Sequence, residues 1–298
     1  MLIGIININK PLKMTSHDVV SKMRKILGIK KIGHGGTLDP LASGVLPICI
    51  NKATRLTQYL PTDKQYIAEI TLGITTSSYD SDGEITSKQD YKAISSIIIE
   101  ELEKFKGKIT QEVPLTSATH YQGQKLYKYA QKGIEITDLP TKEVTIYDIT
   151  ILDKIDEEKN NPTIKLKIDC SSGTYIRSIA NDLGKNLKCG AYLSSLQRTL
   201  SSGLKIDNSY TLEEVEQIAT EGNVESILVS PQSLISWPEH LIGFGQIERI
   251  SKGQFFKLTK DSYINEQKVF LVNKESKLIA IGEYDQTEQI IKPKLVFT

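Results

Sequence analysis

Apolar residues recur along this chain at two spacings, and the two spacings predict two kinds of element. Alternating or unbroken apolar runs of strand length predict strands at residues 2–8, 45–50, 65–72, 144–152, 163–170 and 193–200. Apolar positions three and four residues apart predict helices from Thr15 or Ser16 to Gly28, over 53–60, 94–105, 125–132 and 175–187, and after a capping residue at Thr211. Strands and helices are mixed without an internal repeat, so an α+β fold is expected.

The pattern changes after Trp237-Pro238, where we place a domain boundary. Beyond it, glycine turns separate four short strand candidates, at 255–258, 268–272, 278–281 and 294–297. This spacing is typical of a small β-barrel, so we expect a large domain, 1–237, and a small one, 238–298. Residues 113–142 interrupt the large domain as a long excursion with two prolines, two glycines and three tyrosines.

Composition places the chain among globular proteins and excludes several classes. Of its 298 residues, 39% are hydrophobic and 24% are charged, and no apolar run approaches the length of a membrane span. The N-terminus lacks the basic and apolar regions of a signal peptide, so we expect a cytoplasmic protein with no membrane partner. Three scattered cysteines fit neither a disulfide framework nor a zinc site, so no metal is expected.

The net charge of +1 conceals two basic stretches. Residues 10–34 carry seven Lys or Arg against one acid, and residues 104–132 carry six Lys against one acid. Such stretches could form a phosphate-binding face, although two solvated helix faces would give the same pattern.

The segment 33–47, GHGGTLDPLASGVLP, concentrates the candidate chemistry. Four glycines and two prolines surround a single carboxylate, Asp39. Glycine opens backbone conformations that are closed to other residues, and proline fixes φ, so a shaped loop is expected to present Asp39 beside a buried strand. From spacing alone Asp39 could equally be an ordinary turn residue, because Asp-Pro is a common turn signal.

Several ordered motifs resemble those of the bacterial tRNA pseudouridine-55 synthase family. The longest is GHGGTLDPLASGVLPICINKATRL, at 33–56. The shorter ones keep the family's order along nearly the whole chain: NKP (9–11), MTS (14–16), KQY (64–66), YQGQKLYKYA (121–130), SGTYIRS (172–178) and CGA (189–191). The resemblance implies a mixed, largely antiparallel sheet of the pseudouridine synthase type with flanking helices and an inserted loop, followed by a small PUA-like barrel.

The resemblance also implies a reaction. A uridine at position 55, in the T-loop of tRNA, is flipped out of its stack, detached from its glycosidic nitrogen, turned and rejoined through carbon, without a cofactor. Asp39 would be the essential carboxylate, acting as a nucleophile or as a base toward the sugar. Arg177 would pair with Asp39 and keep it ionised and oriented.

The same motifs imply roles for five further side chains. Tyr66 would stack on the target base, Tyr175 would buttress the ion pair, and Leu196 would line the pocket wall. His34 would lie beside the flipped nucleotide, and Lys10 would support the active-site loop. Without the resemblance, each would pass for an ordinary core or surface residue.

The expected partner is tRNA, bound by a monomer. The excursion at 113–142, with Lys125, Lys128 and Lys132, resembles the family's insertion that grips the T-loop, and the C-terminal barrel would contact the acceptor stem.

The chain departs from the family pattern at three positions. Gly35 stands where Thr is more usual, Thr116 where Tyr is usual, and His120 where Lys is usual. The changes at Thr116 and His120 are expected to affect RNA contacts and not the carboxylate.

Parts of the sequence also fit two other functions. The protein could be a tRNA-folding chaperone in which chemistry is secondary. Alternatively, residues 33–44 could be the phosphate loop of a nucleotide enzyme, although the glycines match neither GxxxxGK[ST] nor GxGxxG.

Overall fold

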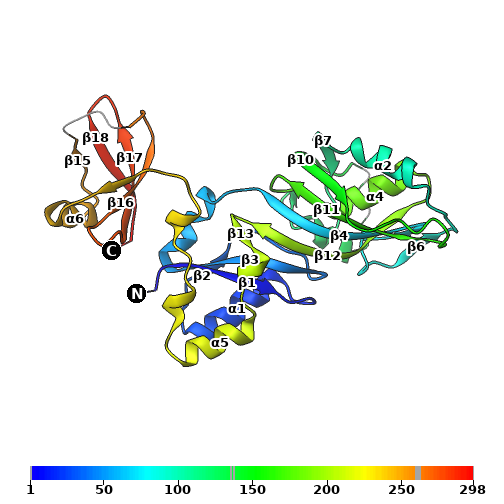
Figure 1. Ribbon diagram of the computed structural model, residues 1–298, viewed down its shortest axis with the longest axis horizontal. Coiled ribbons are helices and arrows are strands. Elements are labelled where there is room, and N and C mark those ends of the chain that lie inside the picture. Colours follow the sequence, from blue (N-terminus) through cyan, green and yellow to red (C-terminus); the bar gives the residue numbers. More distant parts are fainter. Residues whose placement is uncertain (1, 135, 137, 259–262, 298) are drawn as a thin grey trace.

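A computed structural model describes residues 2–134, 136, 138–258 and 263–297. Two β-sheets organise them, and Figure 1 shows the smaller sheet as a separate lobe at one end of an elongated molecule. Within the described residues, no helix combines the length and the hydropathy needed to cross a membrane.

The larger sheet has nine strands in the order β1-β3-β12-β4-β11-β10-β7, with β2 beside β3 and β13 beside β12. The strands are β1 (Gly4–Lys10), β2 (Ile32–His34), β3 (Ala42–Ile50), β4 (Lys64–Leu72), β7 (Gly107–Glu112), β10 (Thr141–Ile151), β11 (Thr163–Cys170), β12 (Ala191–Ser201) and β13 (Leu204–Lys205). Every pairing is antiparallel except that of β3 with β12, so the predicted mixed, largely antiparallel sheet is confirmed.

Helices cover the sheet in two groups. Near β1 and β3 lie α1 (Ser16–Leu27) and α5 (Leu212–Thr220), while α2 (Ser95–Glu103) and α4 (Ile176–Asn186) lie near β4, β11 and β12 (Figure 1). The predicted limits of α1 are confirmed, because Thr15 forms a capping box at its start and Gly28 ends it in the left-handed conformation.

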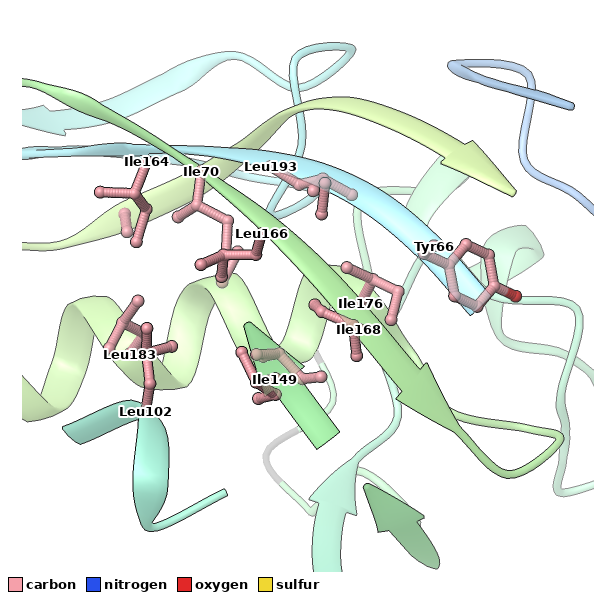
Figure 2. Close-up of a cluster of buried hydrophobic side chains, with 14 of the residues drawn as sticks. Tyr66, Ile70, Leu102, Ile149, Ile164, Leu166, Ile168, Ile176, Leu183 and Leu193 are labelled. Atoms are coloured by element: carbon pink, nitrogen blue, oxygen red, sulfur yellow. The ribbon is translucent and has the colours of Figure 1, made fainter. Parts of the chain in front are cut away.

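Buried aliphatic side chains fill the space between α4 and the sheet. Figure 2 shows Leu183 of α4 beside Leu102 of α2, with Ile70, Leu166 and Leu193 on the strands above the helix, and all five belong to one buried cluster. Tyr66 lies at the edge of this cluster, with its hydroxyl pointing away from the aliphatic groups. The core therefore ends at the point where β4 begins.

The parallel contact between β3 and β12 depends on a glycine. Gly44 has φ +105°, and a Cβ atom there would lie 2.2 Å from the Arg198 carbonyl oxygen. Only glycine allows this approach, which joins the start of β3 to the middle of β12. The strand that follows the Asp39 loop is thereby fixed to the centre of the sheet.

Two predicted helices differ from the structure. Residues 51–59 form a 3₁₀ helix, η1 (Asn51–Tyr59), in which the hydroxyls of Thr54 and Thr57 donate to carbonyls three residues back. In α2, Ile98 and Leu102 are buried as predicted, but Ile97 is 44% exposed. This short helix therefore buries a narrower stripe than its sequence suggests.

Smaller elements complete the larger part of the chain. They are β5 (Ile74–Thr76), β6 (Ile85–Lys88), β8 (His120–Tyr121), β9 (Gln124–Lys125), α3 (Leu126–Gln131), η2 (Ile206–Asn208), η3 (Val224–Ile227) and η4 (Pro231–Ser233). Of these, β8, β9 and α3 belong to the predicted excursion at 113–142.

The second sheet is a curled half-barrel of five strands in the order β14-β16-β17-β18-β15. Its elements are β14 (Glu239–Leu241), α6 (Phe244–Ser251), β15 (Phe256–Lys257), β16 (Lys268–Val272), β17 (Leu278–Asp285) and β18 (Ile290–Val296). The sequence did not predict β14 or α6, because β14 is three residues long and α6 buries only Ile250.

The two sheets share a hydrophobic cluster. Ile5 and Val45 of the larger part pack in the same cluster as Phe270 and Ile281 of the half-barrel. The ring of Trp237, between the two sheets in sequence, lies 5.3 Å from that of Phe270.

Candidate active site

The loop 35–41 connects β2 to β3, and the segment after β1 fixes its backbone. The Leu38 N–H donates to the Ser16 hydroxyl at 2.8 Å, and this hydroxyl donates to the Leu38 carbonyl at 3.1 Å. The Pro40 carbonyl accepts from the Lys13 N–H at 2.8 Å. The loop is therefore held on both sides of its carboxylate.

Arg198 holds the same loop from β12. Its fully buried guanidinium donates to the Thr37 carbonyl at 3.2 Å and to the Gly36 carbonyl at 3.1 Å. Its Nε donates to the Val45 carbonyl at 2.8 Å, beyond the start of β3. The shaped loop predicted from glycines and prolines is thus made by side chains from outside the motif.

The predicted contact between Asp39 and Arg177 is present. The Arg177 Nη2 atom lies 3.0 Å from the Asp39 Oδ2 atom, and the two side chains are 5% and 36% exposed. Arg177 lies in the first turn of α4, and its guanidinium also reaches the Asp80 Oδ2 atom, 3.2 Å from Nη1. One arginine therefore lies between a partly exposed and a buried carboxylate.

Asp80 belongs to none of the motifs that carry the family resemblance, and it stands in the polar segment Asp80-Ser81-Asp82-Gly83, whose composition is that of a turn. The backbone does turn there, but the Asp80 side chain is 3% exposed. It accepts hydrogen bonds from the Ser78 hydroxyl and from the Asp82 N–H. Burial raises the pKa of Asp80, while these hydrogen bonds and Arg177 oppose the rise.

Thr116 has a different position from the one expected. Its hydroxyl oxygen accepts a hydrogen bond of 2.6 Å from the Arg177 Nη1 atom. The expectation that this departure would not concern the carboxylate is therefore wrong, because Thr116 holds the arginine that holds Asp39. A sequence motif could not reveal this, since 61 residues separate the two.

Tyr66 and Leu196 lie on neighbouring strands at the same end of the core. Both are buried, at 5% and 7% exposed. In β12, Leu196 pairs with Ala42 of β3 and Ala68 of β4, and Arg198 pairs with Tyr66. Burial raises the pKa of the Tyr66 hydroxyl, with the Arg198 charge acting in the opposite direction, so the phenol is neutral at pH 7.

Lys10 is buried and acts on the loop through an intermediate turn. Its Nζ donates to the Pro11 carbonyl at 2.8 Å and to the Met14 carbonyl at 2.7 Å. The same turn holds the Asp39 loop, because its Lys13 N–H donates to the Pro40 carbonyl. Burial lowers the pKa of Lys10 to about 8, while Asp39 counteracts the shift.

His34 ends β2 and lies next to the glycines of the loop. Its Nδ1 atom accepts from the Gly36 N–H at 3.4 Å, so the neutral ring carries its proton on Nε2. Burial lowers the pKa of His34, and the Arg198 charge adds to this effect, so the neutral form predominates at pH 7.

Tyr175 connects the site to the excursion at 113–142. It precedes α4, and its hydroxyl forms a hydrogen bond of 2.9 Å with the Thr119 hydroxyl. Its backbone N–H donates to the Gln111 side chain at 3.0 Å. Tyr175 therefore holds the excursion close to Arg177, which lies two residues later in the chain.

The second basic stretch divides into two parts. Lys104 and Lys106 pair with glutamates of α2, each at 2.7 Å, and Lys108 lies 3.9 Å from Glu143, so the charges of these three are balanced locally. Lys125, Lys128 and Lys132 pair with no carboxylate within the described residues, and Lys128 and Lys132 are exposed. The three lysines selected from the sequence are thus those with charge available to a partner.

The structure does not support the nucleotide-loop alternative. Residues 33–44 lead from β2 into β3 and not into the N-terminus of a helix, where a phosphate loop places its ligand. Among the described residues, no three His, Cys, Asp or Glu side chains gather in a way that could hold a metal ion.

Comparison with known proteins agrees with this fold. The solved structure named "Crystal Structure of a Cbf5-Nop10-Gar1 Complex" matches with a TM-score of 0.70 and 25% identity, over 99% of this chain and 85% of that chain. The family described as "TruB family pseudouridylate synthase (N terminal domain)" matches residues 24–176. The fold and the loop around Asp39 are therefore those of a pseudouridylate synthase.

Curated relatives extend the match to the whole chain. Two proteins named tRNA pseudouridine synthase B, from Dehalococcoides mccartyi (strain BAV1) and Geobacillus thermodenitrificans, are each 39% identical to it. Each comparison covers 99% of this chain, and 96% and 99% of the respective relatives. The chain belongs to the TruB family.

Proposed function

We propose that this protein isomerises uridine 55, in the T-loop of tRNA, to pseudouridine without a cofactor. The single observation that carries this proposal is the ion pair between Arg177 of α4 and Asp39, which stands on a loop fixed from two sides. Asp39 is partly exposed while its partner is buried, so the carboxylate can meet a substrate without leaving the arginine.

The reaction requires one carboxylate in its ionised form. The bond from C1′ of the ribose to N1 of the base breaks, the base turns, and a bond from C1′ to C5 forms. The proton leaves C5, and N1 of the product carries a proton, so atoms balance without a co-reactant. Arg177 stabilises the charged form of Asp39, which can attack the sugar as a nucleophile or remove a proton from it.

Tyr66 and Leu196 form the wall that meets the flipped base. The Tyr66 ring stacks on the base, because its hydroxyl points out of the core and its ring is the last of the buried cluster (Figure 2). His34, neutral and beside the loop, lies next to the extruded nucleotide. Lys10 maintains the loop by fixing the turn that binds Pro40.

The insertion and the C-terminal part grip the rest of the tRNA. Residues 1–237 form the catalytic domain, whose insertion at 113–142 grips the T-stem-loop through Lys125, Lys128 and Lys132. Residues 238–298 form a PUA-like domain on the acceptor stem. The protein acts as a monomer in the cytoplasm.

Asp39→Asn tests the proposal directly. The substitution keeps the size of the side chain but removes its charge, so tRNA binding is expected within threefold of the wild type while pseudouridine falls below detection. Purified protein is incubated with tRNA without added cofactor, and pseudouridine is mapped at single-nucleotide resolution. Pseudouridine at position 55 formed by Asp39→Asn at the wild-type rate would contradict the assignment.

The same variant separates the enzyme from the chaperone. If refolding of a misfolded tRNA is accelerated equally by the wild type and by Asp39→Asn, the protein also acts as a chaperone. Loss of both activities would place the two functions in one site.

A further inference from the structure

Two cationic nitrogens face one small space beside the Asp39 loop. Gly36 has φ +146°, and the point where a Cβ atom would stand lies 3.7 Å from Lys64 Nζ and 3.8 Å from Arg198 Nη1. Both are ordinary contact distances, so the two nitrogens lie against the backbone of the loop at Gly36, which carries no side chain to keep them apart from it. Gly36 lies three residues before Asp39, in the same loop.

Within the described residues, the positive charge of these two side chains has no carboxylate partner. Arg198 is fully buried, donates to three carbonyl oxygens and also lies against the Tyr66 hydroxyl, and these neutral groups satisfy N–H groups but leave the net charge in place. Lys64 Nζ has neither a carboxylate nor a hydrogen-bond acceptor within the described residues. Burial and the Arg198 charge lower the pKa of Lys64 to about 8, so the ammonium still predominates at pH 7.

The neighbouring charges do not compensate for this excess. The two carboxylates of the site, Asp39 and Asp80, both pair with Arg177. Lys10 is buried close by, and its hydrogen bonds go to carbonyl oxygens. Lys10, Lys64 and Arg198 therefore form no ion pair in the part of the chain that the structure describes, and an incoming anion would be stabilised by a low-dielectric, prearranged site.

Register places this space next to the residues that would handle the base. Lys64 and Tyr66 are two apart in β4, so they share a face of the strand, and Arg198 pairs with Tyr66 from β12. A nucleotide whose base meets Tyr66 and whose sugar meets Asp39 carries its anionic groups on the sugar's 3′ and 5′ oxygens. Those phosphodiesters are the anions of the RNA backbone, and one of them comes into reach of Lys64.

We propose that Lys64 and Arg198, beside the loop backbone at Gly36, form a subsite for a phosphodiester that flanks the reacting uridine. Lys64 binds the phosphate oxygen as a point charge, and Arg198 is a positioning residue that also supplies charge. The subsite differs from the exposed lysines of the insertion, because it holds the one nucleotide that reacts. This inference rests on the proposed function.

A chemical double-mutant cycle tests the subsite. Stereopure methylphosphonates, which are neutral, replace the phosphate 5′ or 3′ of the target uridine in a T-stem-loop RNA, one at a time. Wild type and Lys64→Met are compared for Kd and for the single-turnover rate. Lys159→Met, in the exposed hairpin at the opposite end of β11, is the matched control.

One neutral linkage is expected to weaken binding to the wild type by about tenfold, as a lost charge-assisted hydrogen bond does. On the RNA with all its phosphates, Lys64→Met should bind about tenfold more weakly than the wild type. On the RNA with that neutral linkage, Lys64→Met and the wild type should bind equally well. Lys64→Met should also reduce the dependence of the binding constant on salt concentration by about one released counterion. Lys159→Met should behave as the wild type in all of these measurements.

The subsite would be overturned if, for both linkages, the loss of affinity from the neutral linkage and the loss from Lys64→Met simply added. It would also be overturned if Lys64→Met bound the all-phosphate RNA as tightly as the wild type does. Either outcome is distinct from failure of the proposed function, in which the wild type forms no pseudouridine in any RNA. Since Arg198 also fixes the loop backbone, its substitution is not used as the test.

Discussion

The two terminal nitrogens of the Arg177 guanidinium hold three partners from different parts of the chain. Its guanidinium reaches Asp39, Asp80 and the Thr116 hydroxyl, and its side chain is 5% exposed. Its Nε atom has no hydrogen-bond partner within the described residues. A planar, forked cation can serve two carboxylates at once, which a lysine ammonium cannot do with the same geometry.

Asp80→Asn should therefore reduce catalysis more than binding. With one carboxylate neutral, Arg177 is oriented by Asp39 and Thr116 alone, and we expect kcat to fall by about 10–100-fold with tRNA affinity unchanged. Single-turnover rates and equilibrium binding, measured on the same preparations, separate the two effects. Asp82→Asn, at the exposed neighbouring carboxylate, should leave both quantities unchanged. A weaker Kd at constant kcat would show that Asp80 acts on RNA binding.

At the scale of residues, the sequence predicted only those residues of the candidate site that belong to a recognisable motif. Asp39 and Arg177 each stand in a motif, and their contact was predicted. Asp80 and Arg198 acquire their positions through strand register and a buried ion pair, which no local pattern encodes. Lys64 is part of the KQY motif, but the sequence does not show that its ammonium lies close to Arg198 and Gly36.

At the scale of elements, the parallel contact of β3 with β12 is the feature on which the site depends. It brings Gly44 against the backbone of Arg198, and so places the Arg198 side chain under the loop. The strands around it were predicted from apolar spacing. Their order was not, because pairing between distant segments leaves little trace in one sequence.

Gly44→Ala should separate these two strands. The new methyl group would lie 2.2 Å from a carbonyl oxygen at a positive φ, so we expect a loss of about 3 kcal/mol or more in the free energy of unfolding, and loss of turnover. Urea titration followed by circular dichroism measures the first effect. Gly245→Ala, in α6 with open space around it, is the control and should gain about 0.5–1 kcal/mol. Equal stability of the two variants would refute the packing argument.

At the scale of the whole molecule, a shared hydrophobic cluster that includes Trp237 joins the two sheets. The Trp237 ring lies 5.1 Å from the ring of Tyr59 and 5.3 Å from that of Phe270. The sequence showed a boundary at this tryptophan and a small β-rich part beyond it. It could not show that the boundary residue packs against both parts, because this contact depends on the tertiary arrangement.

Phe270→Ala should weaken the junction. Phe270 is fully buried, so its truncation is expected to cost about 3–5 kcal/mol. Because Trp237 is the only tryptophan, its fluorescence should change at a lower urea concentration than the circular dichroism of the larger sheet. Phe244→Ala removes the same atoms from an 87% exposed position and should have no effect. Coincident, unshifted transitions for Phe270→Ala would show that the two parts are not coupled through this cluster.

The hydrogen bonds from Arg198 to the carbonyls of residues 36, 37 and 45 also have a consequence for the protein during its synthesis. These contacts bridge 153 to 162 positions of the chain. During synthesis Asp39 emerges early, whereas Arg198 emerges only after roughly two thirds of the chain has been made. Prematurely terminated chains that end before Arg198 lack these contacts, so we expect such fragments to form no pseudouridine in RNA.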